Sequence, residues 1–146
     1  MVRPVLLLLA LPILLAACGK PAAIKTIASK TGSVTLPKVG TLTLRLEMRE
    51  LEGQKLAVGL FSYAGEETVT LESQVSLYRF DTNKTNALER IEDSFDLASG
   101  STKTISTKTV GETRRSCASV TVRANAFDPD GNEIIKNAVF DVCERN

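Results

Sequence analysis

The sequence has 146 residues, with 18 basic and 17 acidic side chains and a formal net charge of +1. This length is typical of one domain, and a charge near zero argues against a nucleic-acid-binding protein, which carries a basic excess. The chain contains neither His nor Trp, so it lacks an imidazole proton shuttle or metal ligand, and its few aromatic residues argue against a stacking platform for sugars or bases.

The N-terminus has one positive charge, Arg3, then an apolar run of 13 residues, Val5–Ala17, and then Cys18. A membrane-spanning helix needs about 20 apolar residues. A charged start, an apolar run of about 7–15 residues and small residues at its end are typical of a secretory signal. Two alternatives stay open: an ordinary signal peptide beside an unrelated cysteine, and an uncleaved helix.

The stretch Leu15-Ala16-Ala17-Cys18 resembles the lipobox of bacterial lipoproteins. The resemblance implies cleavage of residues 1–17, a diacylglycerol on the sulfur of Cys18, and a further acyl chain, such as palmitate, on its new amino group. The next residue is Gly19 and not Asp, which in a Gram-negative cell favours the outer membrane, with the protein facing the periplasm. We therefore expect a protein of the cell envelope that lipid holds to a membrane.

Removing residues 1–17 from the 146 leaves 129. Residues 18–40 are expected to form a lipidated tether, because they are rich in Gly, Pro and small polar residues and carry no acid. A flexible chain of about 20 residues reaches roughly 25 Å. Its four lysines either contact anionic headgroups or keep a spacer soluble; they are Lys20, Lys25, Lys30 and Lys38.

Residues 41–146 are expected to form an all-β domain. From 41 to 49 every even position is apolar and every odd one polar, which is typical of a half-buried strand. A strand over 55–63 places Leu56, Val58 and Leu60 on one side, and further strands are expected over 68–80 and 87–91. Residues 101–110 are rich in Thr and Lys and read as a polar strand near an edge, where lysines discourage pairing.

The end of the domain predicts a hairpin with a defined register. Apolar or small residues alternate with polar ones from 118 to 126, and residues 128–132 form a strong turn signal. A hairpin centred on Asp130 places Cys117 opposite Cys143. Opposed Cα atoms lie about 4.5–5.5 Å apart, a separation that a disulfide tolerates. The compartments to which proteins are exported permit disulfides to form. We therefore predict a Cys117–Cys143 bridge and no redox role, since there is no Cys-x-x-Cys.

About seven short strands predict an antiparallel two-sheet sandwich of immunoglobulin-like or fibronectin III-like architecture. The stretches 75–81 and 97–101 look similar to small bacterial immunoglobulin-like modules with a V-x-L-Y-D strand and an L-x-P-G turn. Here Arg79-Phe80 interrupts the first motif and Ser99 replaces the proline of the second. Such modules bind or space other molecules, and few of them are enzymes.

Several groups of residues resemble metal-binding or catalytic sites. The turn acids Asp128 and Asp130, with Asn132 and Glu133, resemble calcium ligands, but their spacing does not fit an EF-hand, and a hairpin turn explains them better. The Ser–Lys pairs of residues 101–108 lack the surroundings that a catalytic dyad needs. Two acidic clusters, 66–67 and 92–96, fit solvated turns better than a glycosidase pair.

Two further motifs have simpler explanations than a site. Asn83-Lys84-Thr85 fits the N-glycosylation pattern, which is taken as chance in a bacterial lipoprotein. Arg114-Arg115 beside Cys117 either docks an anionic partner or forms a solvated approach to the strand.

The expected function is a non-catalytic binding or scaffolding module without cofactor or metal. Its partners are a membrane, through lipid on Cys18, and a protein that contacts loops or an exposed sheet edge by strand addition. The alternative is a protease inhibitor or chaperone-like module for exported proteins, and a hydrolase is the most remote alternative.

Overall fold

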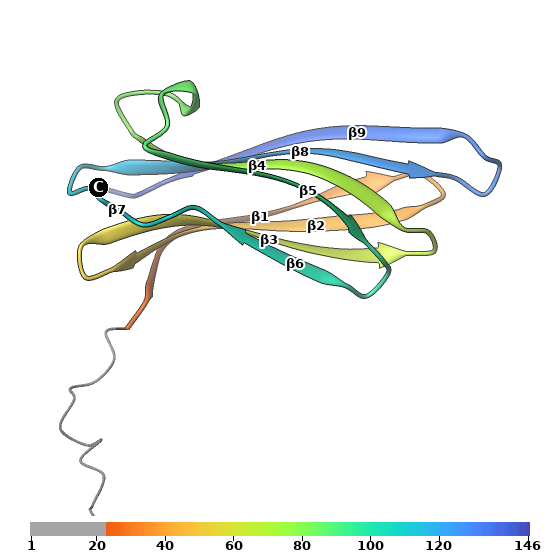
Figure 1. The fold of residues 1–146 in the computed structure, drawn as a ribbon, viewed down its shortest axis with the longest axis horizontal. Coiled ribbons are helices and arrows are strands. Elements are labelled where there is room, and N and C mark those ends of the chain that lie inside the picture. The colour runs from red at the N-terminus through yellow and green to blue at the C-terminus, as the bar shows by residue number, and fades with distance from the viewer. Residues whose placement is uncertain (1–22) are drawn as a thin grey trace, which may run out of the picture.

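The computed structural model describes residues 23–146, and they form two antiparallel sheets packed face to face (Figure 1). One sheet has the order β1-β2-β3-β6, with β7 also pairing with β3, and the other has the order β5-β4-β8-β9. We call them the five-stranded and the four-stranded sheet. The strands are β1 (Lys25–Leu36), β2 (Gly40–Leu51), β3 (Gln54–Gly65), β4 (Val69–Arg79), β5 (Glu89–Leu97), β6 (Thr102–Ser106), β7 (Val110–Gly111), β8 (Ser116–Phe127) and β9 (Glu133–Cys143).

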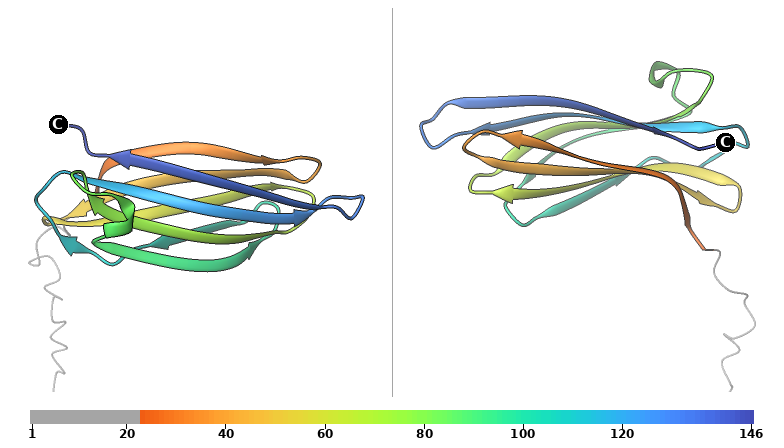
Figure 2. Two further views of the ribbon diagram at one scale, coloured as in Figure 1. Left: turned by 90° about the horizontal axis from the view of Figure 1, so that it is seen from above. Right: turned by 180° about the vertical axis from the view of Figure 1, so that it is seen from behind.

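The predicted fold class, an all-β antiparallel two-sheet sandwich, is confirmed, and the arrangement is compatible with an immunoglobulin-like fold. The chain crosses between the sheets after β3, after β5 and after β7. A short 3₁₀ helix, η2 (Lys84–Asn86), is the one helix in the part of the chain that the structure describes. Figure 2 shows the two layers from above and from behind.

The expected tether over 18–40 is wrong from Lys25 onward, because this segment forms strand β1 along β2. The alternation of polar and apolar residues is regular only at the end of β1, where Val34 and Leu36 are buried. Further back the inward positions are Ala28, Lys30 and Gly32, which hide the pattern in the sequence. Residues 18–22 of the expected tether, and the expected signal peptide, lie outside the described residues.

The other predicted strands are present, with three differences. The strand expected over 101–110 is divided into β6 and β7. The strand expected over 87–91 runs over Glu89–Leu97 instead. Its inward residues Ile91, Phe95 and Leu97 face the core, and the acidic residues between them hide this pattern in the sequence. In β3 the residues Leu56, Val58 and Leu60 do share a side, but it is the outer one. The core side of β3 carries Ala57, Phe61 and Tyr63.

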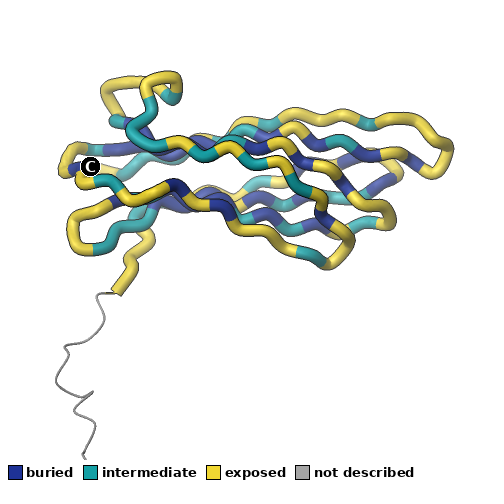
Figure 3. The backbone as a smooth tube through the Cα atoms, viewed as in Figure 1, coloured by how far each residue is buried: buried dark blue, intermediate teal, exposed yellow. Residues whose placement is uncertain are grey.

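The core lies between the sheets, where buried residues, most of them from β2, β3, β4 and β8, gather (Figure 3). Burying each of these large aliphatic side chains stabilises the fold by about 1.5–3 kcal/mol relative to exposure. The core side chains buried most completely come from both sheets: Leu36, Leu42, Leu44, Leu46, Met48, Phe61, Val69, Leu71, Val75, Leu77 and Val120. Val58 is also only 1% exposed, but it lies on the outer side of β3.

The predicted register of the last hairpin is confirmed. Cys117 lies opposite Cys143, and Val120 opposite Phe140, as a turn centred on Asp130 requires. A disulfide joins the two cysteines across 26 residues. In the chain-entropy model a bridge of this span stabilises the folded state by about 3–4 kcal/mol.

The two open sides of the sandwich are closed by different contacts. On one side, the ring of Phe140 from β9 lies over Gly32 of β1, where the absence of a side chain makes room for it. On the other side, Phe61 and Phe95 meet edge to face at 5.4 Å between ring centres. At Gly32, the strand β1 therefore leaves space for a core side chain of β9, and the sequence pattern does not reveal this role.

We predict that Gly32→Ala destabilises the domain by about 1–3 kcal/mol, because its Cβ would overlap the Phe140 ring and overpack the site. Urea unfolding measures the loss. In the Phe140→Leu background the same substitution should cost less. Gly111→Ala, which adds a Cβ in open space, is the control and should change stability by less than about 0.5 kcal/mol. Equal effects of the two alanines would contradict this role of Gly32.

Candidate functional site

Each of the four sheet edges has a strand with a charged residue on its inward side. Lys30 of β1 lies opposite Leu46, Lys103 of β6 opposite Phe61, and Lys136 of β9 opposite Ala124, so all three lysines share the core-facing side of their strands. The same holds for Asp93 of β5, opposite Ser73. All three lysines are nevertheless exposed at the rims of the sandwich.

Inward charges on edge strands are a known defence against pairing with another strand. A strand added to β9 or β1 would have to cover an ammonium group. At the opposite rim, Lys103 is tied to β5, since its Nζ lies 3.8 Å from Asp93 Oδ2 and 5.5 Å from the centre of the Phe95 ring. These positions argue against binding by strand addition at the edges.

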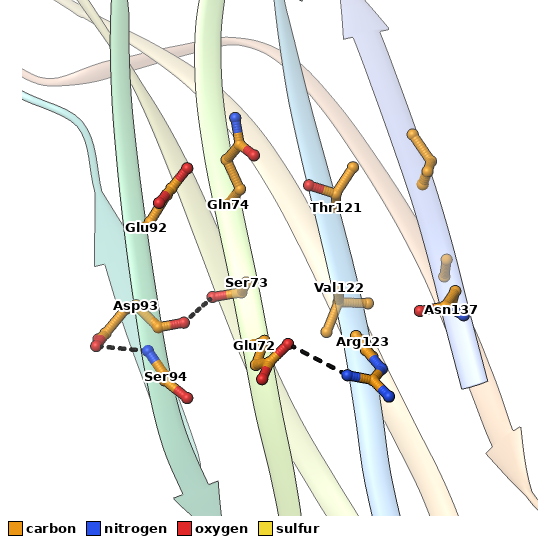
Figure 4. A pocket seen from close by; sticks show the side chains of 12 residues that line it. Glu72, Ser73, Gln74, Glu92, Asp93, Ser94, Thr121, Val122, Arg123 and Asn137 are labelled. Atoms are coloured by element: carbon orange, nitrogen blue, oxygen red, sulfur yellow. Dashed lines mark hydrogen bonds and ion pairs between the residues drawn. The ribbon is translucent and has the colours of Figure 1, made fainter. Parts of the chain in front are cut away.

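A hollow of about 720 Å³ crosses the outer face of the four-stranded sheet (Figure 4). It spans all four strands, from β5 through β4 and β8 to β9. Most of its lining residues occupy outward positions of the sheet, and Ser73, Asp93, Val122 and Ala138 lie between them at inward positions. We call it the sheet hollow; the side chains that define it are Glu72, Gln74, Glu92, Thr121, Arg123, Asn137 and Val139.

The sheet hollow offers hydrogen-bonding groups to a ligand. Arg123 Nη1 lies 3.7 Å from Glu72 Oε2, a weak pairing between exposed groups. Within residues 23–146, the side chains of Gln74, Thr121 and Asn137 have no hydrogen-bond partner in the protein. The amides and the hydroxyl are therefore free to donate to and accept from a bound surface.

Exposed apolar residues lie beside the sheet hollow on the β8–β9 hairpin. Val139, which lines the hollow, is 51% exposed, Phe127 is 60% exposed, and Ile135 is 39% exposed. All three occupy outward positions of the same sheet face. Hydrophobic side chains next to unpaired polar groups are the composition expected of a contact surface for another macromolecule.

The end of the sandwich near the disulfide is held by a buried ion pair that the sequence did not reveal. Lys55 is 3% exposed, and its Nζ lies 2.9 Å from Glu144 Oε2. The same ammonium donates to the carbonyl of Arg114 at 2.7 Å, and Glu144 also accepts from the backbone N–H of Ser116 at 2.6 Å. This network ties the segment after β9 to β3 and to the start of β8.

A buried carboxylate, Glu47, lies on the outer face of the five-stranded sheet between two arginines. Arg45 Nε donates to it at 2.6 Å and Arg49 Nε at 2.7 Å. Burial opposes its ionisation, but these hydrogen bonds and the two positive charges outweigh that effect and lower the pKa of Glu47. The carboxylate is thus held in its charged form and is suited to positioning the two guanidinium groups.

The acidic residues at the turn between β8 and β9 make hydrogen bonds within the hairpin. Asp128 Oδ1 accepts from the backbone N–H groups of Asp130 at 2.9 Å and Asn132 at 2.8 Å. The hydrogen bond from the Asn132 backbone contributes most to lowering the pKa of Asp128. The side chain of Glu133 instead accepts from Asn125 at 2.6 Å. The structure therefore places these residues as a hairpin turn, as the sequence favours.

The remaining candidate residues are dispersed. The cluster expected in a turn at 92–96 lies on β5, where Glu92 and Asp96 face outward and Asp93 inward. The acids of 66–67 do lie in the turn between β3 and β4. Within residues 23–146 neither Ser101 and Lys103 nor Ser106 and Lys108 share a hydrogen bond, and Lys103 pairs with Asp93 instead.

The Arg114-Arg115 pair takes part in contacts within the domain. The guanidinium of Arg115 stacks 3.6 Å above the ring of Phe80, and its Nε donates to the carbonyl of Glu144 at 2.6 Å. Arg114 is exposed, and its backbone holds Lys55. Asn83 accepts from the Thr85 backbone at the start of η2. Cys18, the expected lipid site, lies outside the described residues.

Comparison of the chain with protein-family models, with curated proteins and with solved structures finds no match. Within residues 23–146 no helix has the length and apolar character to cross a membrane. In the same residues no three His, Cys, Asp or Glu side chains gather as metal ligands would. The sheet hollow is the candidate site because it combines unpaired polar groups with an apolar border.

We predict that Glu144→Ala destabilises the domain by about 3–5 kcal/mol, because it leaves the ammonium of Lys55 buried without a counter-charge. Chemical denaturation measures the loss. The double variant Lys55→Met/Glu144→Leu removes both charges and should be more stable than Glu144→Ala. Arg145→Ala, at an exposed neighbour, serves as control. A cost of Glu144→Ala no greater than that of the control would refute the role of the pair.

Proposed function

We propose that the protein is a lipid-anchored protein of the cell envelope that acts as a non-catalytic binding module for another protein. The sequence supports the anchor through the resemblance of residues 15–18 to a lipobox, with Cys18 as the acylated residue. The residue after it, Gly19, supports the outer membrane, facing the periplasm, if the cell is Gram-negative. Three acyl chains give attachment well beyond the marginal binding of one.

The observation that carries the binding role is the sheet hollow with its apolar border on the β8–β9 hairpin. A partner there can bury Phe127, Ile135 and Val139 and pair with the free amides and hydroxyl of the hollow. The inward charges at the edges favour this face over strand addition. The alternative role, a protease inhibitor or chaperone-like module, would use the same face and differ in the partner captured.

The anchor is tested by fractionation of cell envelopes. The unaltered protein should sediment with membranes and leave them only with detergent, whereas Cys18→Ala should appear in the soluble fraction. High salt, which removes proteins held by charge alone, is the control. Sedimentation of Cys18→Ala with the membranes would contradict the lipid anchor.

The binding face is tested by in-cell photo-crosslinking from two exposed positions. A crosslinker at Asn137, in the sheet hollow, should capture one protein, and one at Thr104, on the opposite sheet, should not. Adding Val139→Asp should reduce the capture from Asn137 by about tenfold, as a loss of about 1.4 kcal/mol requires. Thr104→Asp is the matched control. Equal capture from both positions, or capture that Val139→Asp leaves unchanged, would refute this face.

A further inference from the structure

We infer that the outer face of the five-stranded sheet lies toward a bilayer with anionic headgroups, so that the sheet hollow points away from it. The inference rests on the proposed lipid anchor at Cys18. It adds an orientation and a second contact surface, whose ligand is the membrane itself. Three observations carry it: the length of the linker, the side from which it enters the fold, and the charges of the two faces.

The linker is much shorter than the sequence predicts. Because β1 begins at Lys25, only six residues, 19–24, lie between the fold and Cys18. The seven Cα-to-Cα steps from Cys18 to Lys25 span at most about 25 Å when fully extended. The 12 residues of β1 alone extend over about 40 Å. The linker is therefore shorter than the domain is long, and it keeps the start of β1 within about 25 Å of the membrane that holds Cys18.

The chain enters the fold from the side of the five-stranded sheet. In Figures 1 and 2 the described residues before and at the start of β1 bend away from the four-stranded sheet. Ile24 is 60% exposed at this point. Two sheets about 10 Å apart, with their outer side chains, make a layer about 20 Å thick. Turning the domain over would use nearly the full length of the linker.

The outer faces of the two sheets differ in charge. The outward positions of the four-stranded sheet have a net charge of −3, from the acids Glu72, Glu92, Asp96, Glu133 and Asp141 and the bases Arg90 and Arg123. Those of the five-stranded sheet have a net charge of +1, from Arg45 and Arg49 against Glu47. An anionic surface repels the first face and attracts the second.

The outer face of the five-stranded sheet suits headgroups in other ways. Its outward positions present a row of hydroxyl groups on β1, β2 and β6, which can hydrogen-bond to phosphate and carbonyl oxygens: Ser29, Thr31, Ser33, Thr35, Thr41, Thr43, Thr102, Thr104 and Ser106. Leu56 and Leu60 add half-buried aliphatic surface on β3. A net charge of +1 binds weakly alone, but the short linker keeps this face at a high effective concentration near the bilayer.

The orientation is tested with the full lipidated protein in vesicles of phosphatidylethanolamine and phosphatidylglycerol. A single cysteine is introduced at Thr104 or at Asn137 and labelled with a fluorophore, since the native cysteines are acylated or bridged. Nitroxide quenchers on the lipid headgroups should quench the label at 104 severalfold more than the label at 137. Arg45→Glu/Arg49→Glu, or vesicles of phosphatidylcholine alone, should reduce the difference.

The outcomes separate the orientation from the anchor. Equal quenching at both positions, or stronger quenching at 137, in protein that remains bound to the vesicles overturns the orientation and leaves the anchor in place. Failure of the protein to associate with the vesicles overturns the anchor, and the orientation with it.

Discussion

The inward charge at each edge of the two sheets decides which surfaces of the sandwich stay open to contact. A two-sheet sandwich has four open edges, and each presents unpaired N–H and C=O groups to any free strand. In this protein Lys30, Lys103 and Lys136 guard three of them, and Asp93 guards the fourth. The edges are thereby closed to other chains, while the outer faces of the sheets remain open to contact.

The outer faces of the two sheets differ in charge and composition. The face of the five-stranded sheet carries hydroxyl groups and a net positive charge, and Glu47 holds its two arginines in place. The face of the four-stranded sheet is acidic and has the sheet hollow with its apolar border. In the proposed orientation, the short linker on the first side leaves the second side facing away from the membrane. Between them, the Cys117–Cys143 bridge and the Lys55–Glu144 pair fix one end of the sandwich.

The sequence predicts most where neighbours in space are neighbours along the chain. The last hairpin is read from alternation, a turn and two cysteines, and its register follows. The strand β1 is not predicted, because its inward residues Lys30 and Gly32 do not look like core residues in the sequence. Lys30 lies at the rim of the sandwich, and Gly32 lies beside the ring of Phe140. The sheet hollow is not predicted either, because its side chains come from β4, β5, β8 and β9 and are far apart along the sequence.

The most direct measurement is the association state of a chain whose edge has lost its charge. Cys18→Ala/Lys136→Val, compared with Cys18→Ala alone, keeps the core and removes the ammonium from the inward side of β9. Sedimentation over a range of concentrations should show association of the valine variant through β9 that the parent does not show. Identical sedimentation of the two proteins would contradict the claim that inward charges close the edges and direct binding to the face.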